Sequence, residues 1–148
     1  MIDDAALNSP ILQPIVVLMI WTMIMWAWMY ATRIPAMSRL KVDPDKMVRD
    51  PDASLDRTLP AEVQWKAHNY NHLHEQPTLF YAVALLLAIT GYGDGMNALL
   101  AWIYTGLRII HSLVQVTANR VMVRFVLFAI SSVVLIALIV HAAMVVFD

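Results

Sequence analysis

Polar and ionisable side chains occur at helical spacing within apolar surroundings, and one stretch carries four of them. They follow steps of four, three and four: Tyr104, Arg108, His111 and Gln115. Residues at these steps share one face of a helix, and the intervening residues here are mainly Leu, Ile and Val. A charge in such surroundings must gain an interaction, so we interpret Arg108 as part of a polar site. A structural ion pair with Glu75 or Asp94 is the alternative.

Two further stretches carry polar residues near this one in the expected structure. The first repeats the same steps, with His72 beside them: Gln64, His68, Asn71 and Glu75. This face should lie against protein or water, and a solvated extension outside the membrane explains it equally well. The second is the pair Arg120 and Arg124, one helical turn apart, whose alternative role is that of ordinary topology anchors.

Together these stretches predict a polar pocket with several cations and one carboxylate. Guanidinium groups bind carboxylates in a bidentate manner and Glu75 can pair an ammonium group, so the ligand should be soluble, anionic and amine-bearing. The chain has no cysteine, so any reactive sulfur must come from the ligand. We predict no metal site. A net charge of -1 argues against nucleic acid as a partner.

The elements that must position these residues are membrane helices. Of 148 residues, 60% are hydrophobic and 14% charged, which is far from the balance of a soluble domain. We expect a single all-α domain over 1–148, a bundle of four transmembrane helices. Their expected ranges are about 11–32, 61–90 with a kink at Pro77, 96–117 and 121–147.

The connections and the charges predict the topology. Residues 33–60 form a polar loop, and three glycines in 91–95 supply a tight turn. Basic residues gather in the first loop and at the last connection, which places both in the cytoplasm and both termini outside. Asp3 and Asp4 stand where a cleavable signal peptide has basic residues, so the first helix should be retained as an anchor.

Two segments, in this order and topology, resemble the MAPEG family, the membrane-associated proteins of eicosanoid and glutathione metabolism. The first is Arg108-Ile-Ile-His-Ser112 followed by Asn119-Arg-Val-Met-Val-Arg124-Phe125, similar to the signature across the family's third and fourth helices. The second is His72-Leu-His-Glu75-Gln-Pro77-Thr-Leu-Phe-Tyr81, similar to an Asn-x-x-Glu element followed by Pro and aromatics. The resemblance covers nearly the whole chain and suggests a member of bacterial type, in an inner membrane.

The departures from the family pattern concern single residues. His72 stands in the place of the Asn in the register that retains Glu75, which we prefer; a shift by one aligns Asn71 and puts His74 in place of the Glu. Gln115 falls where several eicosanoid-pathway members have Tyr, and Phe125 where a prostaglandin E synthase has Ser. Prostaglandin isomerisation is therefore disfavoured.

The resemblance implies a homotrimer that binds glutathione between subunits on the cytosolic side and acts as a transferase or peroxidase on lipophilic electrophiles from the bilayer. Arg124 would stabilise the glutathione thiolate, because a neighbouring cation lowers the pKa of a thiol. Arg108 and Arg120 would bind the carboxylates of glutathione, and Glu75 and Asn71 would bind its ammonium and amide groups. Supporting hydrogen bonds would come from three further residues: His72, His111 and Gln115. The alternatives are a non-catalytic lipid-binding protein of the same fold and a structural or transport protein.

Overall fold

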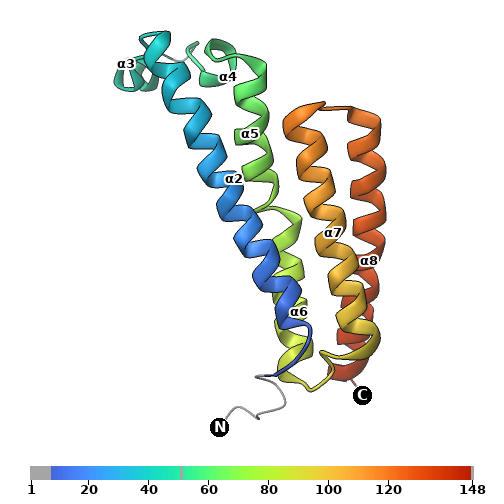
Figure 1. Cartoon of the computed structure of the whole chain (residues 1–148). Coiled ribbons are helices and arrows are strands. Elements are labelled where there is room, and N and C mark those ends of the chain that lie inside the picture. Colours follow the sequence, from blue (N-terminus) through green and yellow to red (C-terminus); the bar gives the residue numbers. More distant parts are fainter. Residues whose placement is uncertain (1–7, 51, 148) are drawn as a thin grey trace.

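The computed structural model describes residues 8–50 and 52–147, and every regular element in that part of the chain is a helix. Figure 1 shows long helices lying side by side: α2 (Leu12–Arg39), the consecutive pair α5 (Ala61–His72) and α6 (Gln76–Ile89), α7 (Gly95–Thr117) and α8 (Val121–Phe147). The prediction of an all-α protein is confirmed. Asp3 and Asp4, on which the prediction of a retained anchor rests, lie outside the described residues.

Three of the described helices, α2, α7 and α8, are long and apolar enough to cross a membrane. Their windows carry few charges over at least 18 residues, which is close to what a hydrocarbon core of about 30 Å requires. The helices α5 and α6 do not meet this criterion, because each is short and α5 is polar. The segment 61–90 is therefore not the single continuous helix that the sequence predicts.

Proline explains the break between α5 and α6. The first helix ends at His72 and the second begins at Gln76, so that Pro77 lies in the first turn of α6. Pro77 has no N–H to donate, and its ring would clash with the carbonyl of Leu73 in a continuous helix. A kink at Pro77 was expected; the structure shows instead a complete interruption just before it, at 73–75.

The first helix is longer than predicted and the first loop is partly ordered. Helix α2 continues through Pro35 to Arg39, seven residues beyond the expected end, because charged residues end an apolar span but not a helix that extends into water. Two short helices follow, α3 (Pro44–Arg49) and α4 (Leu55–Thr58). Asp43 accepts hydrogen bonds from the backbone of α3, and Ser54 from that of α4.

Helix packing brings the polar stretches toward one end of the molecule. Helices α7 and α8 form an antiparallel pair joined by a very short connection, in which Asn119 adopts a φ of 46°. Helix α2 packs on α5, α6 and α7, and α6 also packs on α8. Helices α3 and α4 lie where α2 ends and α5 begins (Figure 1). The N-terminus of α5 and the α7–α8 connection consequently lie toward the same end of the bundle (Figure 1).

The turn 91–95 closes the opposite end. Gly91 and Gly95 have φ values of 82° and 50°, which confirms the predicted need for glycine here. Gly93 serves a different purpose, since its carbonyl accepts a hydrogen bond of 2.9 Å from the N–H of Ile11. A Cβ at Gly93 would overlap the Oγ of Ser9 and would lie 3.1 Å from the Cα of Ala88.

Gly93→Ala should therefore destabilise the protein by about 1–3 kcal/mol, because overpacking forces the start of α2 away from the turn. Thermal unfolding in detergent measures the effect as a lowered melting temperature. Gly106→Ala is the matched control: Gly106 is helical with nothing within 4 Å of a Cβ, so its replacement should not lower the melting temperature. Equal melting temperatures for both variants would contradict the proposed close approach.

Candidate functional site

The polar face of α7 is buried, as its spacing predicts. Tyr104, Arg108, His111 and Gln115 are each at most 3% exposed. Outside this face, α7 exposes large apolar residues such as Trp102, Ile103 and Ile110. The helix therefore presents its polar side chains to the protein and its apolar ones outward, the reverse of a helix in a soluble domain.

Arg108 has an unusual environment. Its side chain is 1% exposed, and its guanidinium carbon lies 5.7 Å from the ring centroids of both Tyr104 and Phe128. All three guanidinium nitrogens, Nε, Nη1 and Nη2, are buried without a hydrogen-bond partner among the described residues. Two aromatic faces compensate only part of the cost of burying a cation. The positive charge of Arg108 is thus not neutralised by any carboxylate among the described residues.

An ion pair between Arg108 and Glu75, the structural alternative for this arginine, is not formed. The Oε2 atom of Glu75 lies 2.7 Å from Nδ1 of His72 instead. Asp94 occupies the N-cap position of α7, in the turn at the opposite end of the bundle, and its side chain makes no capping hydrogen bond. The described residues contain no salt bridge that involves Arg108.

A cavity of about 240 Å³ shares Phe128 with the surroundings of Arg108, although Arg108 itself does not line it. Its lining comes from α5, α7 and α8, and comprises His72, His111, Val121, Arg124, Phe125 and Phe128. The ring of His72 is 5.0 Å from that of His111 and 5.8 Å from that of Phe128, centroid to centroid. Phe128, whose ring lies against Arg108, also forms part of this wall together with Arg124. We call this space the cationic cavity.

Arg124 is held in the cavity wall by the connection between α7 and α8. Its Nη1 donates a hydrogen bond of 2.6 Å to Oδ1 of Asn119, while its Nε is buried and has no partner in the described structure. Asn tolerates the left-handed backbone conformation found at Asn119 better than most residues do. The short turn therefore both reverses the chain and orients the arginine.

Unsatisfied polar atoms concentrate at the cationic cavity. Of the nine buried side-chain nitrogen and oxygen atoms that lack a partner in the part of the chain described, five belong to Arg108, Arg124 and His72. Buried polar groups are almost always satisfied, so such a cluster requires an explanation. Four of the five are guanidinium nitrogens, which can only donate; the fifth is Nε2 of His72. An acidic ligand is the complement of this arrangement.

The predicted polar face of α5 is divided rather than continuous. Gln64 is buried, where its Nε2 donates to the carbonyl of Leu55, whereas His68 and Asn71 are exposed. Glu75 lies beyond the end of α5, in the interruption, and its side chain is 66% exposed. Gln64, His68 and Asn71 keep the predicted spacing within α5, and Glu75 alone leaves this face, because the break before Pro77 ends the helical periodicity.

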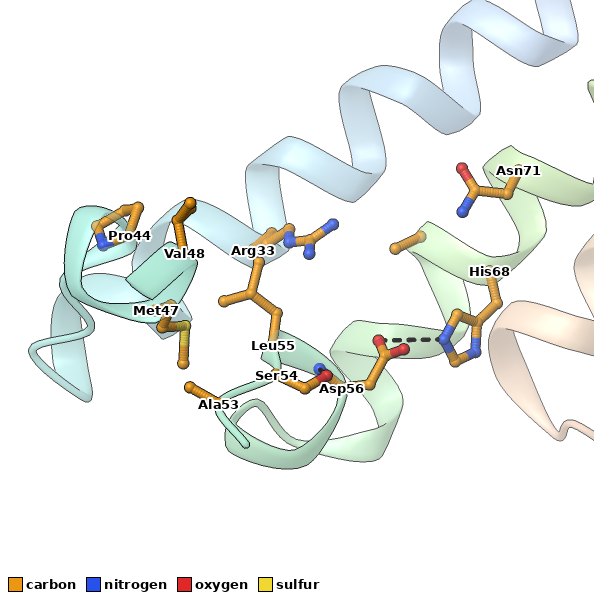
Figure 2. Close-up of a pocket in the computed structure, with 11 residues that line it drawn as sticks. Arg33, Pro44, Met47, Val48, Ala53, Ser54, Leu55, Asp56, His68 and Asn71 are labelled. Carbon is orange, nitrogen blue, oxygen red and sulfur yellow. Dashed lines mark hydrogen bonds and ion pairs between the residues drawn. The ribbon is translucent and has the colours of Figure 1, made fainter. Parts of the chain in front are cut away.

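Asn71 lines a second, larger cavity of about 450 Å³ between α2, α5 and the loop helices (Figure 2). Arg33 projects into it from α2, and His68 on α5 lies 3.3 Å from Asp56 on α4, Nε2 to Oδ1. The structure thus separates Asn71 from the cationic cavity. Arg120 is exposed at the start of α8, and Gln115 is buried with its Oε1 unpartnered; neither lines a cavity described here.

Several residues of this site escaped sequence reasoning. Asn69 is fully buried, and its Oδ1 accepts a hydrogen bond of 3.0 Å from Oγ of Ser112, which joins α5 to α7. Asn119 and Phe128 position Arg124 and cover Arg108. The position of Phe128 one turn after Arg124 was a usable signal, since both must lie on one face of α8. Asn69 carried none, because it falls outside the predicted stripe.

Comparison with known protein families shows to which family this chain belongs. The model of the MAPEG family matches residues 11–144, which includes every residue of the cationic cavity. The chain belongs to the MAPEG family. No curated protein and no solved structure matches the chain. Family membership together with the three apolar helices identifies an integral membrane protein of the kind found in glutathione and eicosanoid metabolism.

Arg108→Met should leave the melting temperature of the ligand-free MAPEG protein unchanged or raise it, because the substitution removes an unpaired buried cation and keeps most of the volume. Ser112→Ala, one turn further along α7, is the comparison variant. It deletes a hydrogen bond that is made and leaves Asn69 unsatisfied, at a cost of about 1–3 kcal/mol. Thermal unfolding in detergent measures both, and a large loss of stability in Arg108→Met would reveal a structural partner for the arginine.

Proposed function

We propose that this MAPEG protein is a glutathione-dependent transferase or peroxidase that acts on lipophilic electrophiles. The proposal includes a bundle of four membrane helices, in which α5 and α6 together supply the fourth crossing, and a homotrimer with glutathione bound near the subunit boundary. The first loop and the α7–α8 connection would lie in the cytoplasm of a bacterial cell and both termini outside its inner membrane, following the basic residues.

The observation that supports this most strongly is the set of unpaired buried donors around the cationic cavity. Arg108 and Arg124 together present four guanidinium nitrogens without partners. A glutathione molecule carries two carboxylates and a thiol, and each can take negative charge toward such donors. The donor set therefore fits this ligand, whereas a neutral lipid would leave the guanidinium groups unsatisfied.

The residues in and beside the cavity have distinct tasks in this proposal. Arg124, half-buried and oriented by Asn119, favours the anionic form of a thiol placed beside it. Arg108 supplies positive charge from behind Phe128 to a carboxylate. His111 adds a hydrogen bond from the buried face of α7. These groups are fixed before binding, so they stabilise charge without reorganising.

The other predicted binding residues lie outside the cationic cavity, and the proposal gives them contacts at the edges of the bound glutathione. Glu75 has an exposed carboxylate that can receive an ammonium group, and Asn71 is available from the second cavity. Arg120 would attract a carboxylate at the cytosolic rim, and Gln115 would support the buried end of the site. Glutathione, when bound, supplies the nucleophilic sulfur that a chain without cysteine lacks.

A lipophilic partner would approach the cavity from the bilayer. Val121, Phe125 and Phe128 give the cavity an apolar side, and two of these residues, Val121 and Phe125, are exposed on the outer surface of α8. Holding a thiolate and an electrophile in one place supplies several kcal/mol of the barrier reduction. The wide apolar contact surface suits a range of hydrophobic substrates rather than one.

A second candidate function is the binding of a lipid without catalysis. Its support is an apolar groove of about 430 Å³ between α6 and α8, lined by residues such as Leu79, Leu86, Ile139 and Val146. This groove would hold an acyl chain by hydrophobic burial alone. The two candidates differ in whether bound glutathione is turned over.

Arg124→Ala tests the leading candidate. The purified wild-type protein in detergent should conjugate glutathione to a generic aromatic electrophile or reduce a lipid hydroperoxide, and the variant should lose at least about 100-fold in kcat. Arg49→Ala, which removes an exposed arginine from α3, is the control and should leave turnover unchanged. Size-exclusion chromatography in detergent checks that the assembly is the same in all three proteins.

The alternatives give different results in the same experiment. Unchanged turnover in Arg124→Ala would exclude Arg124 as the residue that stabilises the thiolate. Glutathione binding by calorimetry without turnover would favour the lipid-binding candidate. Absence of glutathione binding by the wild-type protein would overturn both the transferase and the peroxidase function.

A further inference from the structure

His72 and Glu75 are in direct contact with each other, and the roles given above do not use this contact. Nδ1 of His72 lies 2.7 Å from Oε2 of Glu75, and the His72 side chain is 20% exposed while that of Glu75 is 66% exposed. The other ring nitrogen of His72, Nε2, is buried and has no partner among the described residues. The imidazole is thus hydrogen-bonded through Nδ1, while Nε2 has no hydrogen-bond partner among the described residues.

This geometry fixes the chemical state that His72 offers. A carboxylate accepts a proton donor, so Nδ1 carries the hydrogen in the neutral ring and Nε2 keeps its lone pair. Of the five unpartnered buried atoms of Arg108, Arg124 and His72, Nε2 of His72 is the one that can accept a proton. A carboxylate that orients a histidine and balances its charge after protonation is the general arrangement of a catalytic base.

Charged and titratable groups face His72 from each neighbouring element. The ring of His111 on α7 lies 5.0 Å away, and Arg108 on the same helix lies behind Phe128. Arg124 on α8 lines the same cavity. Both arginines disfavour a second positive charge, and Glu75 alone among these groups favours it. The charge of Glu75 is consequently needed for His72 to hold a proton even briefly.

We propose that His72 is the base that removes the proton from the glutathione thiol, with Glu75 as its orienting partner. This inference rests on the proposed function. Nε2 of His72 accepts the proton as the S–H bond breaks, and the electron pair stays on sulfur, beside Arg124. Nδ1–H of His72 then donates to Glu75 in a charged hydrogen bond. The proton leaves to water after the sulfur has reacted, which returns His72 to its neutral form.

Arg124 and His72 would therefore divide one task. The arginine stabilises the thiolate by charge but, as a permanently protonated group, cannot accept a proton. The histidine accepts the proton, and it is positively charged only while that proton is bound. His72 is in this sense a catalytic residue, and Glu75 a positioning residue whose second carboxylate oxygen stays available to an ammonium group.

His72→Gln is the decisive variant, because Gln can still donate to Glu75 but cannot act as a base. Two quantities are measured on the full-length protein in detergent: the affinity for glutathione by calorimetry, and the ultraviolet absorption of the bound thiolate as a function of pH. His74→Gln is the matched control, since His74 lies two residues away, is exposed, and contacts the carbonyl of Tyr70 rather than the cavity. His72→Asn serves as a second variant with the same loss of the base.

The expected result is a His72→Gln protein that binds glutathione within about twofold of wild type but forms little thiolate at neutral pH. Its thiolate signal should rise with increasing pH as hydroxide replaces the base, and its kcat should fall about 100-fold or more at neutral pH. His74→Gln should behave as wild type in each measurement. A wild-type thiolate signal and kcat in His72→Gln, or in His72→Asn, would overturn the role of His72 and leave the proposed function intact. Failure of the wild-type protein to bind glutathione would overturn both.

Discussion

The buried, unpaired guanidinium group of Arg108 is the constraint on which the rest of this structure depends. A cation with 1% exposure costs free energy unless it meets an anion or several acceptors. Here it meets two aromatic rings, of Tyr104 and Phe128, and no carboxylate among the described residues. The polar face of α7 and the covering by α8 keep this group inside the protein.

The interruption between α5 and α6 determines where the side chain of Glu75 lies. Pro77 ends the hydrogen-bond ladder of α5 and leaves Glu75 between two helices, close to His72. The carboxylate that could have neutralised Arg108 is thereby bound to an imidazole instead. One backbone break consequently leaves the arginine without a carboxylate partner and places Glu75 in contact with His72.

The two cavities are lined by polar residues that differ in exposure. The larger one, which contains Arg33 and Asn71, is built on the parts of α2 and α5 beside the loop helices, where water satisfies exposed groups. The smaller one lies between α5, α7 and α8, and its donors are buried. Only in the second does the low polarity of the surroundings strengthen the interactions of a charge, which is why we place the chemistry there.

The sequence by itself determined the helical class, the polar face of α7 and the need for glycine at 91–95, because helical periodicity and backbone freedom are local properties. It also identified Arg108 and Arg124 as candidates, since charges in apolar runs stand out in any register. The tertiary structure alone decided that Asn71 and Glu75 separate, that Asn119 and Phe128 hold the two arginines, and that Asn69 joins α5 to Ser112. These contacts connect residues from different helices, and their formation depends on where Pro77 breaks the chain and how α8 folds back on α7, which no local pattern encodes.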